Sequence, residues 1–173
     1  MFVHTFYLRK KKPDVTFLQE VWYKKDYDFL QDCLGDHFHL SEFDLECGET
    51  TPMVNIKCSG VTTVTQYKIL NQRYENLSSG NNWASEVSLE LWSDHLTSRK
   101  VLFNDIEVGG CRFRLVNTHL TPYDDATEQK REVRVEQTNT LITALGCHWD
   151  FVILGMDMND VPSKSCFLSK HWS

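Results

Sequence analysis

The sequence predicts an α/β fold, because segments with strand-like and helix-like patterns alternate along the chain. Residues 61–67 (VTTVTQY) are rich in β-branched side chains, which favour a strand. Residues 126–145 carry apolar side chains at helical spacing, which predicts an amphipathic helix. The chain has 173 residues, of which 41% are apolar, and this length suits one globular domain rather than two. We therefore expect residues 1–173 to form a single α/β domain.

The first quarter of the chain predicts a helix, a strand and a second helix. Residues 2–12 have the pattern of a helix end, and the apolar run in PDVTFLQEV, at 13–21, predicts a buried strand. In residues 24–34 (KKDYDFLQDCL), tyrosine and leucine recur at helical spacing, and Gly35 is placed to end the helix. Residues 36–60 are rich in loop-forming residues and contain only short strand candidates.

The middle of the chain predicts three strands. The first is 61–67, and the polar run NLSSGNN, at 76–82, follows as a loop. Residues 100–108 and 111–119 form the next two candidates, and the Gly109-Gly110 pair between them is a typical hairpin turn. We expect these last two strands to pair with each other.

A helix and a further strand follow. Asp125 and Glu128 have the spacing of a capping box at the start of the helix over 126–145. The residues expected on its apolar side are Val133, Leu141, Ile142 and Leu145. The mostly apolar run WDFVIL, at 149–154, predicts a strand that is buried on both faces.

The net charge is −6, with a sequence pI near 5.6, which argues against strong non-specific binding to nucleic acid and against a polybasic membrane anchor. No apolar run is long enough for a membrane span. In residues 1–12 the basic residues follow the apolar ones, the reverse of a secretory signal. If the N-terminus is genuine, we expect a cytoplasmic protein.

The six cysteines show neither a C-x-x-C pair nor a Cys/His cluster at zinc spacing. Reduced thiols scattered through the core are the favoured interpretation. The even count also permits disulfides, and Asn76-Leu77-Ser78 is a glycosylation sequon, so a secreted parent protein stays open. Nothing in the sequence indicates the oligomeric state.

Three of the predicted strands end in polar residues where apolar ones would pack better: Gln19-Glu20, Asn117-Thr118-His119 and Asp157-Met158-Asn159. Taken singly, a strand-end Glu is usually solvated, a strand His is usually hydrogen-bonded in the core, and D-x-N occurs in ordinary turns. The three ends together indicate a site, because strand ends that lie side by side meet at one rim of a sheet. Since side chains alternate along a strand, Asp157 and Asn159 are expected to face the same pocket.

These residue types suit hydrolysis at phosphorus. Mg²⁺ takes oxygen ligands and often only one or two carboxylates, so Glu20 is the candidate metal ligand. The carboxylate of Asp157 would orient or deprotonate a water, and the amide of Asn159 would donate to a phosphate oxygen. His119 would protonate the leaving oxygen or stabilise charge on the phosphate.

With these residues, an ordered set of motifs resembles the endonuclease/exonuclease/phosphatase superfamily, whose fold is that of the pancreatic-type deoxyribonucleases. The motifs are PDVTFLQEV, SGVTTVTQYKIL, VNTHL, RVEQTNTL and VILGMDMND, and they extend over about residues 13–162. The resemblance implies a four-layer sandwich of two mixed sheets flanked by helices, with Mg²⁺-dependent hydrolysis at its rim. By motif it implies that Glu20 binds the metal, and that His119, Asp157 and Asn159 are catalytic.

The same motifs are most similar to those of the neutral sphingomyelinase branch, which cleaves sphingomyelin to ceramide and phosphocholine. The resemblance therefore implies a phosphodiester substrate, with a lipid headgroup favoured over nucleic acid. Two alternatives stay open: a nuclease or DNA-end phosphodiesterase of the same superfamily, and a catalytically inactive fragment or binding protein.

The family pattern is incomplete at both ends. An Asn-bearing first strand and a terminal Asp-His pair have no counterparts in this sequence, so we expect a truncated domain that lacks terminal strands. Ser93-Asp94-His95 repeats the letters of the terminal motif but precedes VNTHL, and we interpret it as a surface turn. Met156 stands where the family has Gly before the Asp, which predicts a bulkier neighbour near the phosphate.

Overall fold

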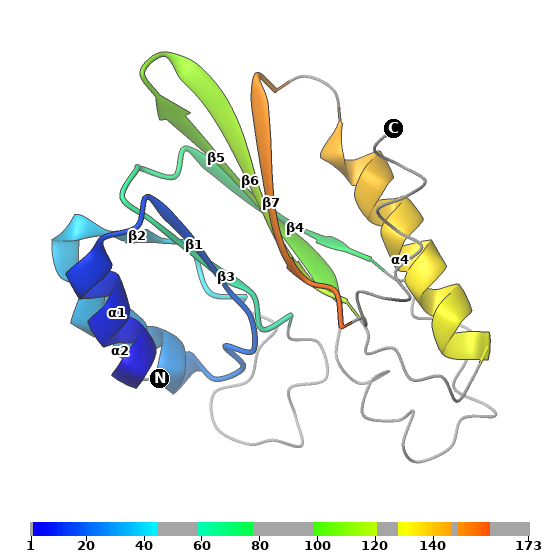
Figure 1. Ribbon diagram of the computed structural model, residues 1–173, viewed down its shortest axis with the longest axis horizontal. Helices are drawn as coiled ribbons and strands as arrows, with labels where there is room; N and C mark the ends of the chain where they lie inside the picture. Colours follow the sequence, from blue (N-terminus) through cyan, green and yellow to red (C-terminus); the bar gives the residue numbers. More distant parts are fainter. Residues whose placement is uncertain (1, 45–58, 78–98, 121–127, 147–148, 160–173) are drawn as a thin grey trace.

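The computed structural model describes residues 2–44, 59–77, 99–120, 128–146 and 149–159. They form four layers: helices α1 and α2, a first sheet, a second sheet, and helix α4 on the far side (Figure 1). The predicted α/β class with two sheets between helices is confirmed. Within the described residues, no helix has both the length and the apolar character needed to cross a bilayer.

The first sheet is antiparallel in its described strands and has the order β1-β3-β2. Its strands are β1 (Val15–Leu18), β2 (His39–Leu40) and β3 (Thr62–Thr65). Helices α1 (Phe2–Lys11) and α2 (Lys24–Leu34) cover its outer face, and a short 3₁₀ turn, η1 (Gly35–His37), follows α2. These elements agree with the predicted segments.

The apolar stripe of α2 explains why this helix packs on the sheet. Tyr27, Leu30 and Leu34 are all buried, as their spacing predicts. Gly35 ends the helix with a φ of 61°, a left-handed conformation that glycine adopts without strain. Leu34 then packs with Leu8 of α1 and Val64 of β3, which joins both helices to the sheet.

The second sheet has the order β4-β5-β6-β7 and is mixed, because β6 and β7 are parallel. Its strands are β4 (Asn71–Asn76), β5 (Lys100–Val108), β6 (Cys111–His119) and β7 (Phe151–Asp157). Gly109 and Gly110 form the predicted hairpin, with φ values of 60° and 81°. Strand β4 was not predicted, because NQRYEN is polar and gives no β-branched signal.

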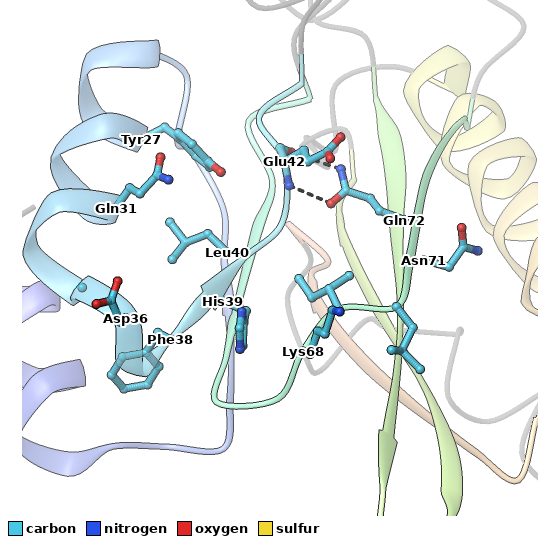
Figure 2. A pocket seen from close by; sticks show the side chains of 13 residues that line it. Tyr27, Gln31, Asp36, Phe38, His39, Leu40, Glu42, Lys68, Asn71 and Gln72 are labelled. Atoms are coloured by element: carbon cyan, nitrogen blue, oxygen red, sulfur yellow. Dashed lines mark hydrogen bonds between the residues drawn. The ribbon is translucent and has the colours of Figure 1, made fainter.

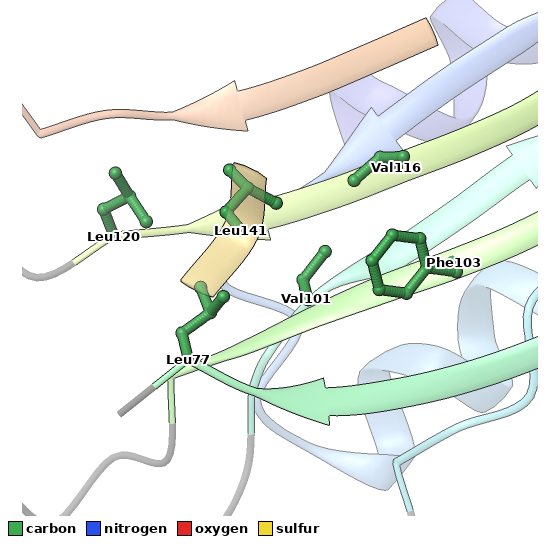
Figure 3. Packing of buried hydrophobic residues seen from close by; sticks show 6 residues of the cluster. All are labelled: Leu77, Val101, Phe103, Val116, Leu120 and Leu141. Atoms are coloured by element: carbon green, nitrogen blue, oxygen red, sulfur yellow. The ribbon is translucent and has the colours of Figure 1, made fainter. Parts of the chain in front are cut away.

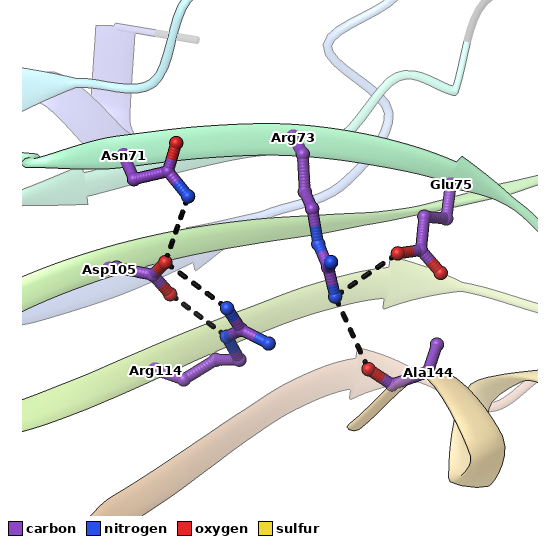
Figure 4. A network of polar contacts seen from close by, with 6 residues as sticks. All are labelled: Asn71, Arg73, Glu75, Asp105, Arg114 and Ala144. Carbon is purple, nitrogen blue, oxygen red and sulfur yellow. Dashed lines mark hydrogen bonds and ion pairs between the residues drawn. The ribbon is translucent and has the colours of Figure 1, made fainter. Parts of the chain in front are cut away.

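Helix α4 (Glu128–Leu145) covers the outer face of the second sheet and completes its core. Leu141 packs against buried side chains of the sheet and of the segments that flank it (Figure 3). The members of this cluster are Leu77, Val101, Phe103, Val116, Leu120 and Leu141. The other end of the same sheet face is polar but still buried, and there Arg114 pairs with Asp105 through two hydrogen bonds of 2.9 and 3.1 Å (Figure 4).

Two predictions about burial are wrong. Strand β7 is not buried on both faces, because it is the edge strand of the described sheet and Phe151, Val152 and Ile153 are 52%, 42% and 40% exposed. On α4, Ile142 is 38% exposed, whereas Arg134 and Gln137 are buried. The helix therefore directs two polar side chains inward.

Several predictions fall outside the described residues. They concern the candidate strands within 45–58, most of the loop at 76–82, Asp125 of the capping box, Ser93-Asp94-His95, and four of the six cysteines. Of the described cysteines, Cys33 and Cys111 are free thiols.

Candidate active site

The ends of β1, β6 and β7 meet at one rim of the two sheets, as the polar strand ends predict. Asn117 of β6 joins them: its Oδ1 accepts a 2.8 Å hydrogen bond from Gln19 Nε2. Its Nδ2 donates to the backbone oxygens of Leu18 and Thr62, at 3.1 and 3.0 Å. Asn117 is fully buried, so a single side chain satisfies groups on β1 and β3 of the opposite sheet and holds the segment before Glu20 next to the end of β6.

His119 and Asp157 lie side by side because β6 and β7 are in parallel register. The backbone N–H of Leu120 donates to the backbone oxygen of Asp157 at 2.9 Å, which extends the pairing of the two strands by one residue. His119 Nε2 is 3.7 Å from Asp157 Oδ2, and the His119 side chain is 5% exposed while that of Asp157 is 47% exposed. The pair therefore joins a buried imidazole to a carboxylate that reaches solvent.

Asn159 turns back onto this pair. Strand β7 ends at Asp157, and Asn159 has a φ of 50°, so its side chain reaches His119 through a left-handed turn rather than by strand alternation. Its backbone N–H donates to Asp157 Oδ1 at 2.8 Å. Asparagine tolerates this conformation better than most residues, which explains the residue type here.

The contacts of Asn159 also indicate which ring nitrogen of neutral His119 carries the proton. Asn159 Nδ2 donates to the oxygen of Leu120 at 2.9 Å, which sets the orientation of the amide, and the same nitrogen is 2.7 Å from His119 Nε2. Since Nδ2 is a donor, His119 Nε2 accepts, and the proton of the neutral imidazole is on Nδ1. Asn159 and Asp157 thus both approach the same ring nitrogen of His119, the amide as a hydrogen-bond donor at 2.7 Å and the carboxylate at 3.7 Å.

Glu20 lies one residue beyond the Gln19–Asn117 hydrogen bond and is exposed. Its φ of 63° is in the left-handed region, which is unfavourable for glutamate. The neighbouring backbone is held by a hydrogen bond from Val21 N to Gly60 O at 2.8 Å. Strained backbone of this kind clusters at functional sites, and here it carries the predicted metal ligand.

Two close approaches shape the walls of the rim. Gly60 has a φ of 62°, and a Cβ there would be 2.6 Å from the ring of Trp22, whose centroid is 6.2 Å from that of His119. A Cβ on Gly155 of β7 would be 2.1 Å from the ring of Phe17 on β1. Glycine is therefore required at both places for the two sheets and Trp22 to pack.

Met156 does not crowd the site, contrary to the sequence-based expectation. Its side chain packs with the cluster around Leu141, on the helix-facing side of the sheet. Asp157, the next residue of β7, is on the opposite side and reaches His119. Alternation along the strand thus directs the bulky side chain into the core.

One carboxylate at the rim could hold a metal ion. Among the described residues, no three His, Cys, Asp or Glu side chains gather as a ligand group. Mg²⁺ is commonly bound through one or two carboxylates, with water and substrate phosphate completing its shell. The exposed carboxylate of Glu20, which makes no hydrogen bond or ion pair within the described part of the chain, suits that donor set.

A cleft of about 650 Å³ lies elsewhere, between the α2–β2 segment and the connection from β3 to β4 (Figure 2). None of Glu20, His119, Asp157 and Asn159 is among its described lining residues. Lys68 and His39 line it together with Asp36 and Glu42, so it shows no single sign of charge. We place the candidate active site at the rim, where hydrogen bonds join the polar residues, rather than in this cleft.

Sequence reasoning missed one residue that contacts the site. Arg134 of α4 is 9% exposed and donates from Nη1 to the backbone oxygen of Asn159 at 3.2 Å. Arg134 is the first residue of RVEQ in the helix motif. Helical periodicity identifies the apolar face of a helix, so it does not show that an arginine on that helix is buried against the site. Asn117 was within a predicted strand end, although its role in joining the sheets could not be read from the sequence.

Comparisons with known proteins gave matches to solved structures only. No family model matches the sequence, and a search of curated proteins also found no match. Sphingomyelinase C from Streptomyces griseocarneus matches with a TM-score of 0.62 and 21% identity, over 88% of this chain and 53% of that one. A beta toxin variant from Staphylococcus aureus with bound magnesium ions matches at TM-score 0.69 and 16% identity, over 94% and 57%.

Two further matches broaden the range of activities. D. rerio TDP2 in complex with a single-strand DNA product has a TM-score of 0.63 and 16% identity, over 94% of this chain and 54% of its own. An endonuclease/exonuclease/phosphatase from Bacteroides vulgatus has a TM-score of 0.64 and 15% identity, over 92% and 57%. At these identities the likeness shows a shared fold, and the chain spans little more than half of each of these structures.

Proposed function

We propose that this chain, which has the fold of the endonuclease/exonuclease/phosphatase superfamily, carries part of the active site of a Mg²⁺-dependent phosphodiesterase. The observation that supports this most directly is the group of His119, Asp157 and Asn159, joined within 3.7 Å at the rim beside Glu20. A buried imidazole that contacts both an amide and a carboxylate is suited to proton transfer at a phosphate ester.

Each residue then has a distinct role in hydrolysis. Glu20 would hold Mg²⁺, which when bound supplies a Lewis acid for the phosphate oxygens. Asp157 orients the water and takes a proton from it, as the water oxygen forms the new bond to phosphorus and the bond to the leaving oxygen breaks. His119, protonated on Nε2 once the Asn159 amide moves away, gives that proton to the leaving oxygen. The freed amide of Asn159 donates to a phosphate oxygen.

Sphingomyelin is the substrate we propose, cleaved to ceramide and phosphocholine. The motif resemblance and the structural match to a sphingomyelinase C support this choice. The net charge of −6 also disfavours non-specific binding of a polyanionic strand, whereas the zwitterionic phosphocholine headgroup has no net charge. The match to TDP2 makes a DNA-end phosphodiester the competing substrate class.

The test is phosphocholine release from sphingomyelin vesicles, with and without Mg²⁺, by the purified chain. Glu20→Gln should abolish Mg²⁺-dependent release, and His119→Ala should lower it by about 10² to 10⁴. Glu107→Gln, at an exposed position near the β5–β6 turn, is the matched control and should behave as wild type. Cleavage of single-stranded DNA ends alone would support the nuclease or DNA-end phosphodiesterase class, and no cleavage of either substrate would support a catalytically inactive fragment or binding protein.

A further inference from the structure

We propose that Arg134 is a positioning residue that holds Asn159 against His119. The inference goes beyond the roles given above, because it assigns a function to a side chain on helix α4 rather than at a strand end. Its consequence for turnover rests on the proposed function, whereas its structural consequence at His119 does not.

The position of Arg134 is unusual for an arginine. The side chain is 9% exposed, and its Nη1 donates to the backbone oxygen of Asn159 at 3.2 Å. Burying a guanidinium is costly unless it is paired or hydrogen-bonded, so its contacts are expected to be specific. One of them is the carbonyl of a residue that also bonds His119.

The Asn159 turn depends on contacts at each of its groups. Its N–H donates to Asp157, its side-chain amide donates to Leu120 and His119, and its carbonyl accepts from Arg134. The left-handed φ of 50° is intrinsically unfavourable, so these contacts are needed to hold it. Loss of the Arg134 contact should release the carbonyl, let the turn relax and move the amide away from His119 Nε2.

A purely structural role for Arg134 is the simpler alternative, and the chain offers a matched control. Arg73 of β4 also donates to a backbone oxygen of α4, from Nη2 to Ala144 at 3.3 Å, and also contacts Glu75 (Figure 4). Arg73 is far from His119 along the sheet, since β4 and β6 are separated by β5. Removing either arginine breaks a similar bond, but only Arg134 is linked to the imidazole.

The experiment measures the imidazole ¹⁵N chemical shifts of His119, which distinguish the Nδ1–H from the Nε2–H form, in wild type, Arg134→Gln, Arg134→Lys and Arg73→Gln. Wild type and Arg73→Gln should show Nε2 as the acceptor. Arg134→Gln should gain the Nε2–H form, and Arg134→Lys should lie between because lysine can still donate to the carbonyl. If Arg134→Gln does not fold, the ¹⁵N shifts of His119 in Arg134→Lys test the proposal instead, and shifts equal to those of wild type would contradict it.

Turnover gives a second readout. With an active chain, Arg134→Gln should lower kcat about 10- to 100-fold with little change in KM, because the released Asn159 amide is no longer placed to donate to the phosphate oxygen in the transition state, and Arg73→Gln should not lower kcat. Unchanged His119 shifts in folded Arg134→Gln, or equal changes in Arg73→Gln, would overturn the proposal. An inactive wild-type chain would refute the proposed function alone, since the tautomer comparison still judges Arg134.

Discussion

Glu20 and Asn159 are two rim residues other than glycine with positive φ, at 63° and 50°, and the contacts around them differ. Asn159 is held in it by hydrogen bonds to its backbone and side chain. Glu20 is exposed, and no described hydrogen bond to its carboxylate offsets the strain. The unfavourable backbone conformation of Glu20 should therefore lower the stability of the fold, and this cost can be measured.

Replacing Glu20 by Gly and by Ala separates the strain from the carboxylate. Both changes remove the proposed metal ligand, so both should lose the proposed Mg²⁺-dependent activity. Because glycine adopts the left-handed region freely, Glu20→Gly should be more stable than Glu20→Ala by about 1 kcal/mol. Urea unfolding of the two variants checks this, and equal stability would show that Glu20 is not strained.

At the scale of the elements, residue patterns predicted much of the fold. The strands around Phe17, Val64, Phe103 and Leu115 were predicted because β-branched or apolar runs precede polar ends. Strand β4 was missed because its side chains alternate between the sheet and solvent without apolar residues. The exposure of Ile153 was missed because an apolar run does not show how many neighbours its strand has.

The candidate site, like the fold, was predictable from the sequence only in part. His119, Asp157 and Asn159 were predicted together because strand ends share a rim, and the structure places them in contact. The left-handed turn at Asn159 and the reach of Arg134 depend on tertiary packing, which no local pattern encodes.

A buried ion pair connects the segment after β2 to β5 and gives a prediction for these elements. Lys100 Nζ is 2.9 Å from Asp44 Oδ2, and both side chains are buried. Lys100→Met would remove the cation paired with the buried Asp44 carboxylate, so we expect a loss of about 3–5 kcal/mol in unfolding free energy. Asp44→Asn combined with Lys100→Met should recover part of this loss.

The control is Lys24→Met, which removes the more exposed ion pair with Asp28 on α2. Because exposed pairs contribute little, this change should cost less than about 1 kcal/mol. Chemical denaturation measures all three variants, and a similar cost for both lysines would mean that the buried pair is not important for stability.

Tyr74 of β4 gives a prediction about pH. Burial and, to a smaller extent, the nearby Asp44 carboxylate raise the pKa of Tyr74 above its ordinary value of 10.0. Above about pH 10 the unfolded chain loses this proton while the folded chain keeps it, so stability falls as pH rises. Tyr74→Phe should show a smaller fall between about pH 8 and 11, measured by urea unfolding at each pH. Tyr7→Phe, at an exposed position, should retain the wild-type fall.

At the scale of the whole molecule, Asn117 connects the two sheets. Removing its side chain in Asn117→Ala leaves the Gln19 amide and the oxygens of Leu18 and Thr62 without that partner. Since each buried unsatisfied group costs about 1–3 kcal/mol, we expect a loss of about 3 kcal/mol or more. Asn71→Ala, which removes one partly exposed bond to Asp105, should cost about 1 kcal/mol. Hydrogen exchange should show faster opening of β1 and β6 in Asn117→Ala only.

The place of Asn117 has a further consequence for how such a site can change. Glu20 is one residue beyond Gln19, and His119 is two residues beyond Asn117. The hydrogen bond between Gln19 and Asn117 therefore helps to fix the positions of both. A shift of one sheet relative to the other would have to break the hydrogen bonds of Asn117 before it could change the distance between the proposed metal ligand, Glu20, and the proposed acid, His119. We therefore expect adaptation to a larger or smaller substrate to arise in the connections around the rim, while this distance is inherited unchanged.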